Sequence, residues 1–288
     1  MWLSRFSALA LAASVAACGA SDEPTKLWEA SGFQNPESAL PDTDAGVIYV
    51  SNVAGAPADK DGNGFISKLT IDGKVTDEKW VTGLDAPKGL AISNGKLFTA
   101  DIDQLVEIDI ASGSIAARHQ AEGAKILNDI AVDGDGRVYV TDWGGNAIWR
   151  LADGTFEKWL EGDALKHPNG ILVEGDKLVI SSWGSGMKED YSTESPGNLL
   201  TVGIEDKAIA NLGSGTPVGN LDGLEPYDAD SYLVSDWIAG KVFQISRSGE
   251  AKVLLALSQG TANFGYVPST RTVVIPLMVD GKVAAYKF

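Results

Sequence analysis

Six polar residues recur along the chain, each at the start of a similar short segment. They are Glu37, Lys88, Asn128, Asn169, Asp222 and Asn263. Carboxylate and amide oxygens are the ligands that Ca²⁺ prefers, and amides add ligands without adding negative charge. Carboxylates gathered at one point repel one another unless a cation lies between them. If the fold brings these residues together, they predict a divalent cation site, with a solvated polar channel as the alternative.

The segments that begin with these residues share one pattern, in which an apolar strand, a tight turn and a second strand follow one another. They recur at intervals of roughly 40 to 50 residues, the length of one four-stranded blade with its loops. Six copies predict an all-β fold, a six-bladed β-propeller whose axis carries the metal site. The last copy has chain for only three strands, so we expect the N-terminal strand Lys26–Ser31 to complete that blade and close the ring.

In a blade, the start of the first strand and the end of the second strand share one face. The two long loops, Val53–Asn63 and Gly184–Gly197, therefore overhang the face where the six residues gather, and long loops on a rigid scaffold often carry function. Three second strands end in Trp143, Trp183 and Trp237. These tryptophans either wall a substrate pocket or pack between blades.

At this point the sequence resembles the gluconolactonase/regucalcin family of six-bladed propellers. The likeness runs from about residue 36 to the C-terminus and rests on four motifs in the expected order: Pro36-Glu37-Ser38, Leu127-Asn128-Asp129, Pro168-Asn169-Gly170 and Leu221-Asp222-Gly223. It implies that Glu37, Asn169 and Asp222 hold the metal. It also implies that Asn128 contacts the substrate or the metal.

The resemblance implies hydrolysis of a lactone or related ester. A metal on the axis would polarise the carbonyl, and Asp222 would be both ligand and general base. We expect Ca²⁺, with Zn²⁺ or Mn²⁺ as alternatives, and substrate contacts from Asn128, Lys88, Asn263 and the three tryptophans. Lys88 departs from the pattern, because an ammonium group aimed at a cation opposes its binding. It either turns toward the substrate, pairs with Glu37 or Asp222, or takes the place of the metal.

Other functions are less well supported. A non-catalytic propeller that binds an envelope protein or a ligand, with a structural ion, is the main alternative, and a lyase of the strictosidine-synthase-like type is a weaker one. The chain has two histidines, His119 and His167, and no nucleophile-elbow motif for a serine hydrolase. The segment Asp59–Ile66 resembles the start of an EF-hand loop, but Thr70 stands where the bidentate Glu belongs. The loop Met187–Ser195 is a candidate lid.

The N-terminus predicts a lipoprotein. One basic residue, Arg5, precedes the apolar run Phe6–Ala17, and Val15–Gly19 resembles a lipobox around Cys18, the only cysteine. We expect a signal peptide over 1–17, lipidation of Cys18, a tether over 18–25 and the propeller over 26–288. Because Gly19 is not the Asp of inner-membrane retention, the outer membrane, facing the periplasm, is the expected location.

The net charge is −16 and the isoelectric point is about 4.5. Nucleic-acid binding needs a basic face, so this charge argues against it. The expected partners are a small lactone or ester and, through the lipid alone, the membrane. We expect the protein to be a monomer.

Overall fold

The computed structural model describes residues 23–288. The predicted signal peptide 1–17 and the predicted lipidation site Cys18 lie outside the described residues. Within residues 23–288, no helix is both long and apolar enough to cross a membrane. The helical structure of this part of the chain is one short 3-10 turn, Asp163–Leu165.

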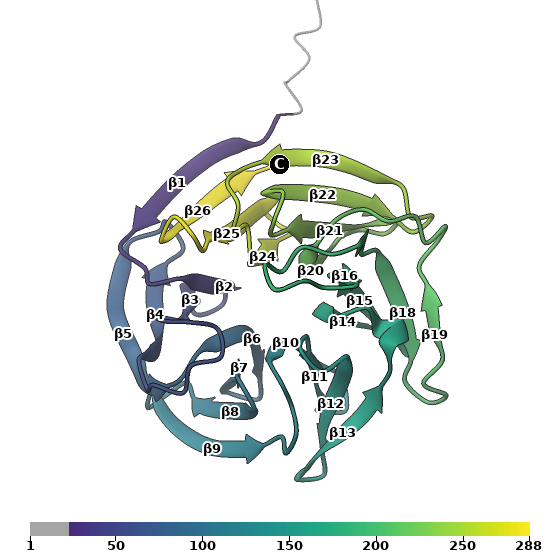
Figure 1. Cartoon of the computed structure of the whole chain (residues 1–288). Helices are drawn as coiled ribbons and strands as arrows, with labels where there is room; N and C mark the ends of the chain where they lie inside the picture. Colours follow the sequence, from purple (N-terminus) through teal and green to yellow (C-terminus); the bar gives the residue numbers. More distant parts are fainter. Residues whose placement is uncertain (1–22) are drawn as a thin grey trace, which may run out of the picture.

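Short antiparallel sheets stand around a central axis (Figure 1), and four of them have four strands each. The first contains β6 (Pro87–Ser93), β7 (Lys96–Asp101), β8 (Gln104–Asp109) and β9 (Ser114–Gln120). The second contains β10 (Leu127–Val132), β11 (Val138–Asp142), β12 (Ala147–Ala152) and β13 (Thr155–Glu161). The third contains β14 (Pro168–Glu174), β15 (Lys177–Ser182), β18 (Leu199–Gly203) and β19 (Ile209–Asn211). The fourth contains β20 (Leu221–Asp228), β21 (Ser231–Asp236), β22 (Lys241–Ser246) and β23 (Ala251–Ala256).

The fifth sheet has eight strands and consists of two four-stranded halves. Its order is β1 (Thr25–Ser31), β26 (Lys282–Lys287), β25 (Thr272–Leu277), β24 (Asn263–Val267), β2 (Pro36–Asp42), β3 (Val47–Asn52), β4 (Gly64–Thr70) and β5 (Val75–Leu84). The halves meet where β2 pairs in parallel with β24. Strand β1 pairs antiparallel with β26, the last strand of the chain. The two ends of the described chain therefore share one sheet, the arrangement that closes the ring.

Burial decreases from the axis outward. Strands β2, β6, β10, β14, β20 and β24 lie closest to the axis (Figure 1). Every residue of β11 is buried, whereas β9 alternates between exposed and partly buried residues. Neighbouring sheets cover the inner strands on both faces, which explains their continuous apolar runs. Between the first and second sheets, for example, Phe98 and Leu105 pack with Ile130, Val140 and Trp149.

The loop after β15 forms a small hairpin of its own. Strands β16 (Gly184–Ser185) and β17 (Ser195–Pro196) pair at its base. The side chain of Asn220 donates hydrogen bonds to the carbonyl of Trp183 (2.9 Å) and to Thr193 Oγ1 (3.0 Å). These contacts attach the loop to the neighbouring sheet, beside the ring axis.

Candidate functional site

A cavity of about 230 Å³ lies where the innermost strands begin. Five of the six polar residues singled out in the sequence line it: Glu37, Lys88, Asn128, Asn169 and Asp222. Each is the second residue of its strand, in β2, β6, β10, β14 and β20 respectively. The structure therefore brings together residues that are spread over most of the chain.

A register irregularity positions each of these five residues. In β14, Pro168 pairs with Ser182 and Ile171 pairs with Ile180, so Asn169 and Gly170 lie opposite Ser181 alone. The same shift occurs at the start of β2, β6, β10 and β20. Two residues facing one make a β-bulge, which re-aims the bulged side chain. The bulges turn the five polar side chains into the cavity.

Hydroxyl groups on the second strands stabilise four of these bulges. Ser51, Thr141, Ser181 and Ser235 each accept a hydrogen bond, at 2.8 to 2.9 Å, from the backbone N–H of the residue after the cavity residue. Three of these hydroxyls also donate to the next sheet, to the carbonyls of Asn169 (2.6 Å), Asp222 and Ala262 (3.0 Å). The recurring Ser or Thr one residue before the end of the second strand is visible in the sequence but was not used in the sequence analysis. In β7, Ala100 occupies this position.

Small residues follow the cavity residues because the strands crowd together there. A Cβ on Gly170 would lie 2.4 Å from the carbonyl oxygen of Asp222, and one on Gly89 would lie 2.6 Å from that of Asn128. Both distances are far below a normal van der Waals contact, so glycine is required for this close approach.

Four oxygens of the cavity residues are buried without a hydrogen-bond partner anywhere in residues 23–288. They are Glu37 Oε2, Asn128 Oδ1, Asn169 Oδ1 and Asp222 Oδ1. Such atoms are rare in folded proteins, because an unsatisfied buried polar group costs about 1–3 kcal/mol. Two carboxylates and two amides suit a hard divalent cation. The described residues contain no cluster of three His, Cys, Asp or Glu side chains, so the amide oxygens are essential to a site of this kind.

The electrostatics of the cavity favour a positive charge. Burial raises the pKa of Glu37 well above its usual value, and the negative charge of Asp222 raises it further. Burial also raises the pKa of Asp222 well above its usual value, with contributions from the charges of Asp129 and Asp236. A cation between Glu37 and Asp222 would favour the ionised form of both carboxyl groups and offset the repulsion between them.

Lys88 is buried, and its ammonium group is bound by the backbone. Its Nζ donates to the carbonyls of Pro57 and Ala86, at 2.9 Å each. Burial lowers the pKa of Lys88 to about 8. Because Glu37 Oε2 and Asp222 Oδ1 have no hydrogen-bond partner, Lys88 does not bond to these atoms. The ammonium group therefore lines the cavity without a hydrogen bond to these two atoms, although its positive charge lowers the pKa of Glu37 and partly offsets the effect of burial.

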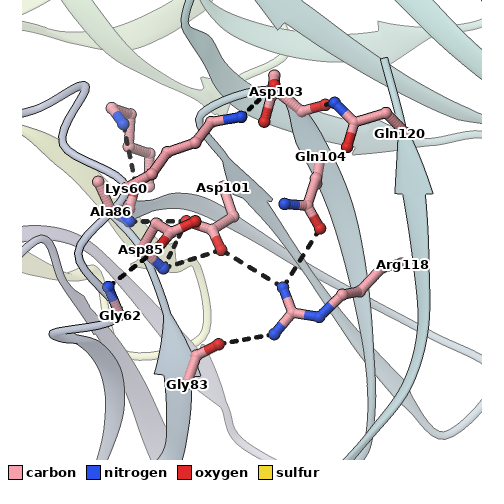
Figure 2. Close-up of polar contacts among 11 residues, drawn as sticks. Lys60, Gly62, Gly83, Asp85, Ala86, Asp101, Asp103, Gln104, Arg118 and Gln120 are labelled. Carbon is pink, nitrogen blue, oxygen red and sulfur yellow. Dashed lines mark hydrogen bonds and ion pairs between the residues drawn. The ribbon is translucent and has the colours of Figure 1, made fainter. Parts of the chain in front are cut away.

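A polar network fixes the backbone at Asp85 and Ala86, the second of which binds Lys88 through its carbonyl (Figure 2). The buried Asp101 carboxylate accepts hydrogen bonds from the N–H groups of Asp85 and Ala86 (2.7 to 3.1 Å) and lies 3.7 Å from Arg118 Nη1. On the long loop, Gly62 N–H donates to Asp85 Oδ1 (3.0 Å), as Figure 2 shows. The loop 53–63 is thereby fixed against the start of β6.

An aromatic wall forms the opposite boundary of the cavity. It consists of Trp143, Trp183, Trp237 and Tyr191. The ring centroids of Trp143 and Trp183 are 5.6 Å apart in an edge arrangement, those of Trp183 and Trp237 are 6.2 Å apart, and Tyr191 lies 5.5 Å from Trp143. The tryptophans predicted to contact substrate thus line the same cavity as the oxygens. Tyr191, from the loop after β15, was not singled out in the sequence analysis.

The structure does not bring Asn263 into this cavity, which corrects the expectation of a six-membered ring. Asn263 Nδ2 donates to Asp129 Oδ1 across the axis (2.7 Å). Both residues line a separate cavity of about 310 Å³. Asn263 is the first residue of β24, whereas the other five are the second residues of their strands, and its hydrogen bond to Asp129 holds its amide in the separate cavity.

The remaining polar features have local structural roles. His119 Nε2 lies 2.7 Å from Glu107 Oε1, and His167 Nδ1 lies 2.9 Å from the carbonyl of Trp143. In the segment that resembles an EF-hand, Asp61 accepts hydrogen bonds from the backbone (3.0 Å) and side chain (2.8 Å) of Asn63. These contacts close a turn and leave the Asp61 oxygens paired.

Comparison with known proteins defines the fold. No protein-family model matches the sequence, and a search among curated proteins gives no significant relative. Among solved structures, a gluconolactonase from Xanthomonas campestris is similar with a TM-score of 0.67 and 16% identity, over 92% of this chain and 89% of that one. A protein assigned as a gluconolactonase gives 0.64 and 18%, over 92% and 91%. Virginiamycin B lyase from Staphylococcus aureus gives 0.62 and 14%, over 92% and 100%.

The chain is therefore a β-propeller. At these identities the likeness shows the fold alone, because one propeller scaffold hosts many functions. Any statement about chemistry has to rest on the cavity and its residues.

Proposed function

We propose that this protein is a six-bladed β-propeller hydrolase that cleaves a lactone or related ester at a divalent cation site on its axis. The two halves of the eight-stranded sheet would count as two blades. Support for the reaction comes from one observation above all: four unpaired buried oxygens meet in a cavity that also has an apolar wall. The similarity to gluconolactonase structures agrees with this function.

Glu37, Asn169 and Asp222 would hold the cation, which we propose to be Ca²⁺, with Zn²⁺ or Mn²⁺ as alternatives. Asn128 Oδ1 shares the cavity and would bind either the cation or the substrate. When bound, the cation would polarise the substrate carbonyl and stabilise the negative charge that develops on its oxygen. The Lys88 ammonium, held by two carbonyls, would add a positive charge beside the developing charge.

Asp222 would act as the general base. The bound cation would keep the Asp222 carboxylate ionised at neutral pH, which is the form that accepts a proton. Asp222 would take a proton from water as the water oxygen adds to the carbonyl carbon. The carbon–oxygen bond of the lactone then breaks, and the proton returns from Asp222 to the leaving oxygen. The product is a hydroxy acid.

We propose the cell envelope as the location, with a lipid on Cys18 holding the protein at the outer membrane on the periplasmic side. The substrate would be a small diffusible molecule, and the protein would act as a monomer. The support is the sequence around Cys18. Metabolic labelling with a fatty acid, in the wild type and in Cys18→Ser, tests this part independently of the reaction.

The central experiment combines metal analysis with a lactone panel. Purified protein is titrated with Ca²⁺, Zn²⁺ and Mn²⁺ by calorimetry, and sugar, aromatic and acyl lactones are screened with and without chelator. We expect hydrolysis that chelation abolishes, and a loss of at least about 100-fold in kcat for Asp222→Asn, as is typical of removing a general base. Chelator-resistant hydrolysis would contradict the role of the cation.

The alternative is a non-catalytic propeller that binds an envelope protein or a ligand and uses the cation as a structural ion. The long loops over the cavity would suit such a role. If the protein binds the cation but hydrolyses no compound of the panel, and Asp222→Asn behaves like the wild type throughout, the binding role replaces the enzymatic one.

A further inference from the structure

Trp143 carries an unsatisfied hydrogen-bond donor in the same cavity as the unpaired oxygens. Its side chain is buried, and Nε1 has no acceptor within the part of the chain that the structure describes. A buried N–H without an acceptor costs about as much as a lost hydrogen bond. Tryptophan at binding surfaces commonly uses this group for a ligand, while its ring packs against apolar groups. Trp143, which lines the cavity, therefore carries a donor that no atom of residues 23–288 uses.

The neighbouring indole differs in this respect. Trp183 Nε1 donates to the carbonyl of Tyr191 at 2.8 Å, and this bond holds the loop after β15 against the wall. Trp183 thus has a structural bond, whereas Trp143 has a free donor. The two rings are adjacent, with centroids 5.6 Å apart. Their different hydrogen bonding therefore does not arise from different positions in the molecule.

The rest of the wall provides apolar surface and few polar groups. Besides the four aromatic residues, Ile126, Pro57, Gly55 and Met278 line the cavity, and Asn35 adds one uncharged polar side chain. Apart from Asn35, the polar side chains of the cavity are those proposed to bind the cation or the substrate carbonyl, together with a lysine that two carbonyls already bind. A polyhydroxylated substrate would have to bury its hydroxyl groups against this wall without partners, which is unfavourable. An aryl or alkyl group would bury well there.

We infer that the substrate is a lactone or ester with an aryl or alkyl substituent, which packs against Trp143, Trp183, Trp237 and Tyr191, and that Trp143 Nε1 donates a hydrogen bond to an oxygen of this substrate. The inference rests on the proposed function and adds the substrate class and a specificity-determining residue. Trp143 supplies both surface that selects the substituent and a donor that orients the ester group.

The first test uses the unmodified protein. Hydrolysis of an aryl-substituted δ-lactone is compared with that of a polyhydroxylated δ-lactone of the same ring size, at saturating Ca²⁺. We expect kcat/KM to favour the aryl lactone by at least about tenfold, the range that a hydrophobic pocket supplies. Equal rates, or a preference for the polyhydroxylated compound, would overturn the inference while leaving the proposed function in place.

The second test measures binding without turnover. The corresponding aryl δ-lactam, which resists hydrolysis and keeps the carbonyl acceptor, is titrated by calorimetry into wild type, Trp143→Phe and Trp237→Phe. Both variants keep an aromatic ring, but only Trp143→Phe removes the donor that is buried without an acceptor among residues 23–288. We expect a loss of about tenfold in affinity for Trp143→Phe and a smaller loss for Trp237→Phe. Equal losses would overturn the donor role of Trp143.

A control variant shows whether a loss of binding reflects recognition of the ligand or a folding defect. Trp80→Phe changes a tryptophan on the outer strand β5, packed on Tyr49, and should keep wild-type affinity and rate; circular dichroism checks the fold of every variant.

If no lactone is hydrolysed but the aryl lactam binds in a Trp143-dependent way, the proposed reaction fails and the ligand class stands. If the lactam does not bind at all, the inference is overturned.

Discussion

Thr141 Oγ1 donates a hydrogen bond to the carbonyl of Asn169, at 2.6 Å, across the interface between two sheets. The same hydroxyl accepts a hydrogen bond from the N–H of Asp129, at 2.9 Å. One buried side chain thus stabilises the bulge that presents Asn128 and fixes the backbone of Asn169. Two proposed site residues, far apart in the sequence, depend on this hydroxyl.

Removing this hydroxyl should affect both stability and the site. For Thr141→Val, we expect a loss of about 1–3 kcal/mol in the free energy of unfolding, because two buried backbone groups lose their partner. We also expect a several-fold weaker cation affinity, and recovery of both in Thr141→Ser. Chemical denaturation and calorimetry measure these effects. Ser231→Ala is the control, since its buried hydroxyl lies at the start of β21, where it donates to Asp228 and accepts from Gln244; it should lose stability but keep its cation affinity.

The stability of the metal-free protein should depend on pH in a specific direction. The pKa values of Glu37 and Asp222 are raised, and burial raises that of Asp129 to about 7. A carboxyl group with a raised pKa in the folded state contributes its full stability below the unfolded value of about 4, and this contribution is lost as the pH rises through the folded pKa. With chelator present, we therefore expect Tm to fall between about pH 5 and pH 8.

Added Ca²⁺ should offset that fall, and the gain in Tm should be larger at pH 8 than at pH 5, because the ligands must be deprotonated. Thermal scans across this pH range, with and without the ion, measure both effects. Asp222→Asn should flatten the pH dependence in chelator and reduce the gain from Ca²⁺. A gain in Tm that is independent of pH would contradict the proposed ligands.

Lys88 should oppose cation binding without preventing it. Lys88→Met removes a positive charge from the cavity, so we expect cation affinity to rise by roughly 3- to 10-fold. Stability without metal should decrease, because the carbonyls of Pro57 and Ala86 lose their donor. Calorimetric titration and denaturation, carried out on the same preparation, separate the two effects. If the variant loses cation affinity, Lys88 supports the site in a way that its two carbonyl bonds do not explain.

Gly170 should tolerate no side chain. In Gly170→Ala, the added Cβ would meet the carbonyl oxygen of Asp222 at 2.4 Å and Ser181 Oγ at 2.6 Å. We expect a loss of about 1–3 kcal/mol from overpacking, together with weaker cation binding, because Asp222 must shift. Gly134→Ala is the control, since nothing lies within 4 Å of the Cβ position there; its unfolding free energy should change by less than about 0.5 kcal/mol. Equal effects of the two substitutions would contradict the crowding described here.

Much of the fold could be predicted from the sequence, because strand and turn patterns are local. The repeated pair of strands placed Glu37, Asn128, Asn169 and Asp222 at equivalent points, and the structure brings them to one cavity. The same repeat placed Asn263 with them. That placement was wrong because the direction of a side chain at a strand start also depends on its partners from other sheets, and Asn263 bonds to Asp129 in a separate cavity.

The amino-acid sequence by itself determined the all-β pattern, the recurrence of polar residues at the strand starts, and the small residues beside them, since each depends on neighbours along the chain. Only the tertiary structure decided that Lys88 is bound by two carbonyls, that four oxygens and the indole N–H of Trp143 are left without partners, and that Asn263 bonds to Asp129 across the axis. Whether a buried polar atom is satisfied depends on groups that only folding brings within hydrogen-bonding distance.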